Sequence, residues 1–186
     1  MKAILIKDIL VSNPDGHEVQ ILGWVRTKRD SKNLCFIQVN DGSCFATIQL
    51  TFDRENANPN NENIENTLPN VTTGASIKAT GKLIPSPASG QAVEVALETL
   101  EVLGVSPSDY PLQKKGHTVE FLRENSHLRA RTNMFGAVAR MRSEMAFAVH
   151  SFFQEKGFFY FNAPLITCSD CEGAGEMFQV TTLDLE

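Results

Sequence analysis

The feature that most constrains this chain is a series of five short segments between residues 21 and 103 that have the pattern of β-strands. Each is rich in β-branched residues or alternates apolar and polar side chains, as strands with one buried face do. The segments span residues 21–26, 34–39, 45–50, 76–83 and 93–102. Asp41-Gly42, directly after the second segment, predicts a hairpin turn. The first hundred residues are therefore expected to form a small all-β domain.

The longest connection lies between the third and fourth segments and is rich in asparagine. Residues 53–70 hold seven asparagines and two prolines. Such a stretch has little to bury, so we expect a surface excursion with at most a short helix near Ile64. Five strands with the longest connection in this place match the OB-fold, a barrel that binds single-stranded oligonucleotides. Other small barrels and sandwiches also have five strands, so this pattern alone leaves the fold open.

The second half of the chain changes from strands to a helix. Pro107, Pro111 and Gly116 interrupt residues 105–128, which we expect to be a linker. A helix is predicted from Thr132 or Asn133 as N-cap to a stop at Gly157. Its apolar face has residues at three- and four-residue steps: Met134, Val138, Met141, Met145, Ala148 and Phe152. We therefore predict an α+β fold with a barrel domain in 1–104, a linker in 105–128 and the start of a second domain in 129–186.

The net charge and the hydropathy of the sequence argue against two classes of protein, non-specific nucleic-acid coats and membrane proteins. The formal net charge of −5 argues against a protein that coats nucleic acid non-specifically. A local basic cluster, defined by Arg26, Lys28, Arg29 and Lys32, is either a solvated strand end or a set of phosphate contacts. No apolar run is long enough to cross a bilayer, and the N-terminus lacks the pattern of a signal peptide. We expect a cytoplasmic protein without membrane partners.

The cysteines and histidines give no metal or disulfide pattern. Four cysteines in a chain of 186 residues are not a disulfide framework. Cys168 and Cys171 form a C-x-x-C, but Cys35 and Cys44 do not supply the second close pair that a zinc site needs. The four histidines are scattered. We expect ordinary thiols and no bound metal.

The barrel segments resemble a known family. Gly23-Trp24-Val25-Arg26, continued through Lys28-Arg29 to Leu34-Cys35-Phe36-Ile37, resembles the anticodon-binding domain of the aspartate, asparagine and lysine tRNA ligases. The resemblance implies that Phe36 stacks on an anticodon base while Arg29 and Gln49 contact anticodon groups. An exposed aromatic side chain is a suitable stacking platform, and a glutamine amide offers both a donor and an acceptor. Arg26, Lys28 and Lys32 are weaker candidates for contacts with tRNA phosphate.

Two later segments resemble the catalytic domain of class II tRNA ligases. Residues 156–166 are similar to motif 1, a helix, a Gly-aromatic turn and a strand, whose proline at the dimer interface would be Pro164. Residues 169–178 resemble the mobile loop that closes over the amino acid in the asparagine branch. The resemblance implies that Glu172, Gly173 and Ala174 bind the amino acid, with Glu172 accepting hydrogen bonds from its α-ammonium group. The arginines of residues 127–132 would contact either tRNA phosphate or the barrel.

The resemblance covers nearly the whole chain and implies a reaction. It implies ATP-dependent attachment of asparagine to tRNA-Asn by a homodimer that uses ATP and Mg²⁺. The arginines of motifs 2 and 3, which hold the triphosphate, do not occur in this sequence. We therefore expect no complete catalytic set, weak binding of ATP and Mg²⁺, and an inactive fragment prone to self-association. Two other functions stay open: an aspartate–tRNA ligase of relaxed specificity, and a non-catalytic OB-fold module that binds tRNA or single strands.

Overall fold

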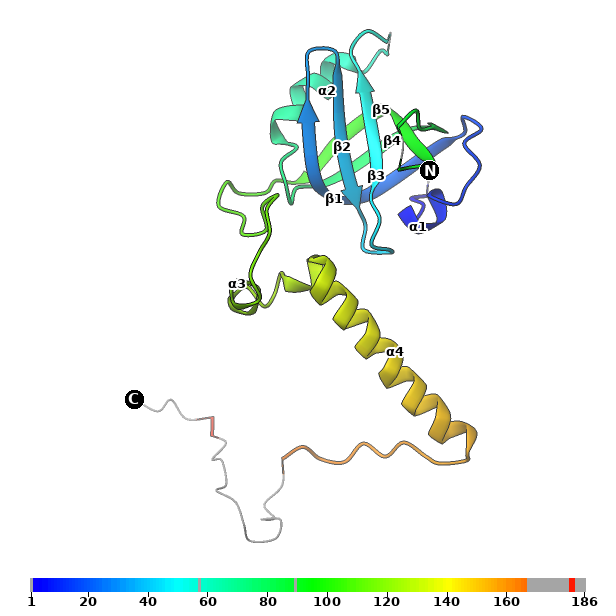
Figure 1. Ribbon diagram of the computed structural model, residues 1–186, viewed down its shortest axis with the longest axis vertical. Helices are drawn as coiled ribbons and strands as arrows, with labels where there is room; N and C mark the ends of the chain where they lie inside the picture. Colours follow the sequence, from blue (N-terminus) through cyan, green and yellow to red (C-terminus); the bar gives the residue numbers. More distant parts are fainter. Residues whose placement is uncertain (1, 57, 89, 167–180, 183–186) are drawn as a thin grey trace. The chain divides into compact units, whose positions relative to one another are not determined.

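A computed structural model describes residues 2–166, apart from 57 and 89, together with 181 and 182 (Figure 1). The chain divides into two units, residues 1–139 and 140–186, and each is described by itself. The strands of the first unit are β1 (Glu18–Asp30), β2 (Leu34–Asn40), β3 (Ile48–Asp53), β4 (Ser76–Pro85) and β5 (Val93–Gly104). They close into a barrel in the order β1-β2-β3-β5-β4. The five-stranded OB-fold barrel predicted from the sequence is confirmed.

The strand bounds differ most from the prediction in β1 and at the start of β3. β1 runs seven pairs along β4, from Glu18 to Trp24, and then along β2 to Asp30, with an irregularity between Val25 and Thr27. This one long strand replaces the predicted segment 21–26, because it borders two neighbours in succession. β3 begins at Ile48 rather than at residue 45. The preceding residues form a loop held by Asn40, whose Nδ2 donates to the carbonyl of Ala46 at 2.7 Å.

The inward-facing side chains of the strands fill the barrel. Alternate residues of β2 and β3, among them Ile37, Leu50 and Phe52, are at most 1% exposed. β3 and β5 pair in parallel while the other neighbours are antiparallel, which closes the sheet and leaves no open edge. The outward residues of the same strands are thereby held on a rigid surface, which positions the candidate site.

The asparagine-rich connection is part of the domain rather than a loose surface excursion. It contains helix α2 (Asn61–Thr67) and the 3₁₀ turn η1 (Leu68–Asn70), whose Ile64 and Leu68 are buried in the core. The sequence left room for a short helix near Ile64, and the structure has one there. Asn58 and Asn60 each donate from Nδ2 to the carbonyl of Glu98 at 3.1 Å, which ties the connection to β5. These two asparagine side chains therefore join the connection to the backbone of β5, although the connection itself is not a strand of the sheet.

The N-terminus also contributes to the barrel. Helix α1 (Ile6–Ile9) buries Ile6 and Ile9 in the same apolar cluster as the strands. The backbone N–H of Ile6 donates to Oδ2 of Asp41 at 2.8 Å, so the hairpin turn predicted at Asp41-Gly42 caps this helix. Gly42 adopts a φ of 83°, a left-handed conformation that favours glycine.

The region after the barrel contains more structure than a linker. Helix α3 (Val119–Glu124) begins at Thr118, whose Oγ1 accepts a hydrogen bond from the N–H of Phe121, and Leu122 is buried. Turn η2 (Arg129–Arg131) precedes helix α4 (Asn133–Glu155), the helix predicted from the sequence, and Gly157 follows its end with a φ of 83°. The domain bounds 1–104, 105–128 and 129–186 stay a prediction.

The long helix is exposed along most of its length. No residue of α4 is buried against the described part of the chain. Residues 158–166 form no strand among the described residues, whereas motif 1 predicted one there. A strand requires a neighbouring strand for its hydrogen bonds, and the described part of the chain offers none to this segment. None of the helices described is both long and apolar enough to cross a membrane.

Candidate nucleic-acid interface

The outer surface of the barrel presents two parallel rows of side chains across β1, β2 and β3. In the first row Arg29 pairs with Phe36, which pairs with Thr51. In the second row Gln38 lies between Thr27 and Gln49. These residues face outward because their sequence neighbours face the core. The structure thus brings the three predicted anticodon-binding residues, Arg29, Phe36 and Gln49, onto one face.

Arg29 and Phe36 form a preassembled pair. The Cζ of Arg29 lies 5.5 Å from the centroid of the Phe36 ring, within the range of a cation–π contact. Arg29 is exposed and Phe36 is half-buried, so both remain open to solvent. A ring and a guanidinium plane can each stack on an unpaired base, and the guanidinium can also donate to phosphate or base oxygens. This pair has the chemistry of a single-strand platform.

Gln49 is less accessible than the sequence suggested. It is 6% exposed, and its Nε2 donates to Oε2 of Glu94 at 3.0 Å. Glu94, on β5, is 5% exposed and also accepts from Ser86 Oγ at 3.1 Å and from Gln91 Nε2 at 3.2 Å. The carboxylate therefore fixes the Gln49 amide, and none of the described residues donates to Gln49 Oε1. One of the two N–H groups of the Gln49 amide is thus occupied by Glu94, while its Oε1 can accept a hydrogen bond from a nucleic acid.

Glu94 is the member of this face that sequence reasoning missed. Its only signal is that Val93-Glu94-Val95 alternates, which places one carboxylate among apolar neighbours. Alternation predicts an outward residue but does not say that the turn between β4 and β5 folds over it. Only the hydrogen bonds from Ser86 and Gln91 show that Glu94 is a buried organiser of Gln49.

Two members of the predicted basic cluster donate hydrogen bonds to backbone carbonyls within the chain. Arg26 Nη1 donates to the carbonyl of Arg131 at 2.6 Å, and Lys28 Nζ donates to the carbonyl of Leu68 at 2.6 Å. Lys32 lies exposed in the turn after β1. An ammonium group has three donors, so Lys28 can make a further contact. The role of Arg26, Lys28 and Lys32 in phosphate binding stays a prediction, with Lys32 the least occupied.

The segment after the barrel is fastened to β1 by an arginine. The Cζ of Arg131 lies 4.7 Å from the centroid of the Trp24 ring, and its Nη1 donates to Tyr110 Oη at 3.4 Å. Tyr110 packs against Gly74, where a Cβ would lie 2.7 Å from the ring. Of the two alternatives for this arginine, tRNA phosphate or the barrel, the structure shows the barrel contact. We call Trp24, Arg131 and Tyr110 the clamp.

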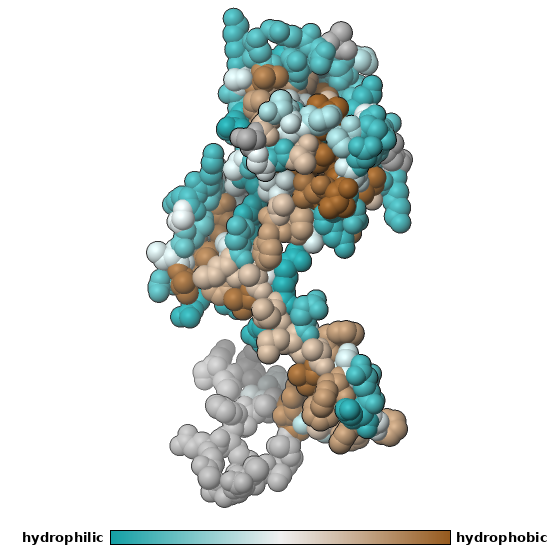
Figure 2. Space-filling view, turned by 45° about the vertical axis from the view of Figure 1, so that its right-hand side comes forward, coloured by the Kyte–Doolittle hydropathy of each residue, from teal (hydrophilic) through white to brown (hydrophobic). Residues whose placement is uncertain are grey.

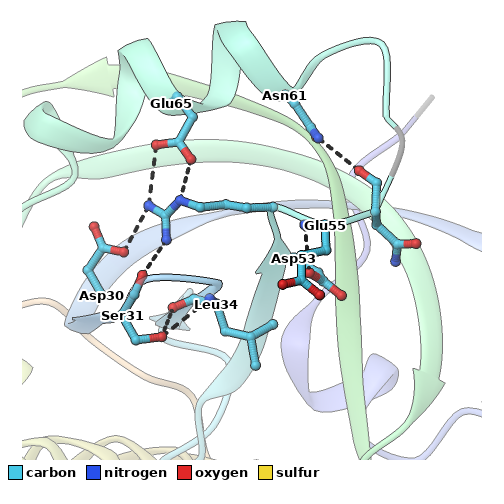
Figure 3. Close-up of polar contacts among 9 residues, drawn as sticks. Asp30, Ser31, Leu34, Asp53, Glu55, Asn61 and Glu65 are labelled. Carbon is cyan, nitrogen blue, oxygen red and sulfur yellow. Dashed lines mark hydrogen bonds and ion pairs between the residues drawn. The ribbon is translucent and has the colours of Figure 1, made fainter.

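Arg54 joins three segments at the end of the barrel that carries Phe36 (Figure 3). Its Nη1 donates to the carbonyl of Ser31 at 2.6 Å, its Nη2 lies 2.9 Å from Oδ1 of Asp30, and its Nε pairs with Glu65 of α2. In Figure 3 the labelled Glu65, Asp30 and Ser31 converge on this one guanidinium group. The hydrogen bonds to Glu65 and Asp30 raise the pKa of Arg54, so the group is charged at every working pH.

The remaining predicted sites lie in the second unit. Pro164 is exposed. Glu172, Gly173 and Ala174, together with the thiols of Cys168 and Cys171, lie outside the described residues. In the part of the chain that the structure describes, no three histidine, cysteine or acidic side chains are grouped so as to hold a metal ion. We therefore assign no described residue to Mg²⁺.

Comparison with known proteins agrees with the two parts of this structure. The family described as OB-fold nucleic acid binding domain matches residues 19–103, and the family described as tRNA synthetases class II (D, K and N) matches residues 118–185. The asparagine–tRNA ligase of Treponema denticola is 59% identical over 98% of this chain, and that of Cytophaga hutchinsonii is 54% identical over all of it. The chain spans 38% and 39% of the lengths of these two relatives.

Solved structures share the fold. The crystal structure of asparaginyl-tRNA synthetase from Pyrococcus horikoshii complexed with asparaginyl-adenylate matches 94% of this chain with a TM-score of 0.77 and 20% identity. The match covers 39% of that protein. Together with the sequence matches over nearly the whole chain, the barrel followed by a class II segment leads to one assignment. The chain belongs to the asparagine–tRNA ligase family of class II tRNA synthetases.

Proposed function

We propose that this chain supplies the tRNA-reading domain of an enzyme that attaches asparagine to tRNA-Asn with ATP. The observation that carries the proposal is the Arg29–Phe36 pair on the outer barrel face, beside the Gln49 amide that Glu94 holds. It fits an unpaired anticodon base, because the ring supplies stacking and the polar groups supply direction. Asparagine–tRNA ligases at 59% and 54% identity support the choice of amino acid.

In the whole enzyme, the proposed reaction joins asparagine to ATP to give asparaginyl-adenylate and then transfers the acyl group to tRNA-Asn. Mg²⁺ would accompany the ATP. The Pyrococcus relative was solved with asparaginyl-adenylate. Glu172, Gly173 and Ala174 are proposed to bind the amino acid on the strength of their resemblance. We further propose that the whole enzyme is cytoplasmic and forms a homodimer. Its interface is proposed to include α4 and Pro164, because apolar side chains on α4 and next to Pro164 are exposed in the single chain.

The first test is selective retention of tRNA. The purified chain is incubated with total tRNA at low salt and washed at moderate salt, and the retained species are sequenced. We expect enrichment of tRNA-Asn that is lost on Phe36→Ala, since one stacked base contributes about 1–3 kcal/mol. Trp24→Phe, which keeps an aromatic ring outside the proposed platform, is the control and should retain tRNA-Asn. Salt must be fixed because phosphate contacts weaken steeply with it.

Other outcomes would redirect the assignment. Equal retention of tRNA-Asp would indicate an enzyme of relaxed specificity. Uniform retention of all tRNAs would indicate a general single-strand module. If Phe36→Ala left the retention of tRNA-Asn unchanged, the Arg29–Phe36 pair would not be the platform that binds the anticodon.

The phosphate contacts need a separate measurement. We expect Lys32→Gln to lower the slope of log affinity against log salt by about 1, as one lost phosphate contact does. Lys28→Gln is the matched control for Lys32→Gln, because it removes the same charge from a lysine whose Nζ already donates to a backbone carbonyl. A slope unchanged by Lys32→Gln would show that this lysine makes no phosphate contact.

A further inference from the structure

Arg54 contacts the turn between β1 and β2, although it follows β3, which lies on the other side of β2 from β1. It directly follows β3, yet it bonds Asp30 and Ser31 at the start of this turn and Glu65 on α2. Its backbone N–H also donates to the carbonyl of Asn33 at 3.0 Å. One residue therefore holds both ends of the turn to β3 and to a helix that itself packs into the barrel core.

The turn between β1 and β2 directly carries the platform. Asp30 pairs with Cys35 as the last pair of the two strands, and Arg29 pairs with Phe36 as the next one. Inside the turn, the N–H of Ser31 donates to the carbonyl of Leu34 at 2.9 Å, which keeps the turn tight. The last pair of a hairpin frays unless its turn is held. Any loosening at residues 31–34 would therefore first displace Arg29 and Phe36.

We propose that Arg54 is a positioning residue for tRNA recognition, which holds the Arg29–Phe36 platform by fastening the 31–34 turn to α2. The inference rests on the proposed function, since it gives the platform a nucleic-acid ligand. Arg54 touches no ligand in this account. It lowers the ordering cost of binding, because a platform that is already fixed loses less conformational freedom when a base stacks on it.

An arginine suits this role better than a lysine. Its planar group donates in three directions at once, here to a carbonyl and two carboxylates. A lysine at this position keeps the charge but cannot span Asp30, Ser31 and Glu65 in a fixed geometry. Arg54→Lys therefore separates charge from geometry.

The test measures affinity for the anticodon stem–loop of tRNA-Asn with the 186-residue chain and its variants. We expect Arg54→Gln to weaken binding about tenfold and Arg54→Lys to weaken it about threefold, through the ordering of the turn. In a Phe36→Ala chain, Arg54→Gln should cost less than about twofold, because residues that act as one unit are not additive. Amide hydrogen exchange at residues 31–34 should become faster in both Arg54 variants.

Lys78→Gln is the charge-matched control. It removes one positive charge and one ion pair, that of Lys78 Nζ with Glu101 Oε2 at 3.2 Å between β4 and β5, and it leaves the turn intact. Its affinity should stay within about twofold of the parent. An equal loss in Lys78→Gln would assign the effect to net charge and overturn the proposal.

Two further results would also overturn it. One is a loss of affinity on Arg54→Gln that is as large in the Phe36→Ala chain as in the parent. The other is unchanged affinity for a folded Arg54→Lys or Glu65→Gln chain whose 31–34 amides exchange faster, and these milder variants keep the test decisive if Arg54→Gln does not fold. By contrast, a Phe36→Ala chain that binds like the parent contradicts the proposed function itself, so the two failures are distinguishable.

Discussion

The barrel and helix α4 differ in how far they bury their apolar side chains. The barrel buries its apolar residues almost completely, as Ile37 and Leu50 at 0% exposed illustrate. On α4, Met141 is 63% and Phe147 is 72% exposed, and apolar surface over this helix appears brown in the lower part of Figure 2. A sheet that closes on itself supplies both sides of its own core, whereas a single helix cannot cover its own apolar stripe.

The difference indicates which part of the chain is self-sufficient. The barrel contains its core, its cap α2 and its N-terminal helix in one contiguous stretch. The apolar face of α4 finds no cover in the part of the chain that the structure describes, so a second surface is needed to bury it. The four predictions below test this contrast, beginning with the largest expected effect.

A substitution in the barrel core should be far more costly than one on the helix. Phe52 is 1% exposed, so Phe52→Ala should lower the free energy of unfolding by about 3–5 kcal/mol through lost burial and a cavity. Met145→Ala on α4, where the side chain is 60% exposed, should change it by no more than about 0.5 kcal/mol. Urea denaturation followed by circular dichroism measures both. Similar losses for the two variants would show that α4 is buried in the folded chain.

The barrel interior should also be sensitive to alkaline pH through Cys35. Burial raises the pKa of this thiol from 9.0 to about 11. Between pH 9 and 11 the folded chain thus keeps the Cys35 proton that the unfolded chain loses. The contribution of the buried, protonated thiol to the free energy of unfolding is fully present below pH 9 and is lost as the pH rises to 11. The loss should reach about 2 kcal/mol in urea denaturation.

The matched variants isolate this thiol from other groups that titrate at high pH. Cys35→Ala should be less stable at neutral pH but lose less stability between pH 9 and 11 than the parent does. Cys44→Ala, which removes a half-buried thiol, is the matched control. A parent and a Cys35→Ala chain with the same pH dependence would contradict the assignment.

The exposed helix should make the chain self-associate. Met141→Glu places a charge on the apolar stripe and should weaken self-association about tenfold or more, since a buried methionine contributes about 1.5–3 kcal/mol. Sedimentation velocity over a range of concentrations gives the constants. Val11→Glu is the control, because Val11 is 85% exposed on the barrel unit. A parent chain that stays monomeric at high concentration would show that the stripe needs no partner.

The smallest expected effect concerns the clamp at the end of the barrel unit. Trp24 is the only tryptophan in the chain, so its fluorescence reports on Arg131 directly. Arg131→Ala should shift the emission and lower the free energy of unfolding by about 0.5–1 kcal/mol, the size of a partly exposed cation–π contact. Arg129→Ala, whose guanidinium lies over Phe135, should leave the emission unchanged. Identical spectra for the parent and Arg131→Ala would place Arg131 away from Trp24 in solution.

Strand alternation and helical periodicity were sufficient to predict much of this molecule. The alternating pattern predicted the barrel, Asp41-Gly42 predicted its turn, and the three- and four-residue spacing predicted α4. Such patterns depend on which side of an element is apolar, and that is a local property of the chain. The resemblance to the anticodon-binding domain singled out Arg29, Phe36 and Gln49, and the structure places them on one face, although their role in binding tRNA stays a proposal.

Long-range contacts were beyond the sequence alone. Nothing in the asparagine-rich run indicates that Asn58 and Asn60 bond β5, and nothing near Arg54 indicates that it meets Asp30, Ser31 and Glu65. Each of these contacts joins residues that are distant in sequence and meet only once the barrel closes. Polar side chains can be satisfied by water as well as by protein, so their partners are set by the closed structure.

The sequence by itself therefore determined which elements form and which of their faces are apolar, because dihedral preferences and periodicity act within a few residues. The tertiary structure decided which side chains stay available to a ligand: Arg29 and Phe36 remain open to solvent, whereas Lys28 and the amide nitrogen of Gln49 have hydrogen-bond partners within the chain. The physical reason is that a donor or acceptor taken from water must find a partner, and only the folded neighbourhood decides which partner is within reach.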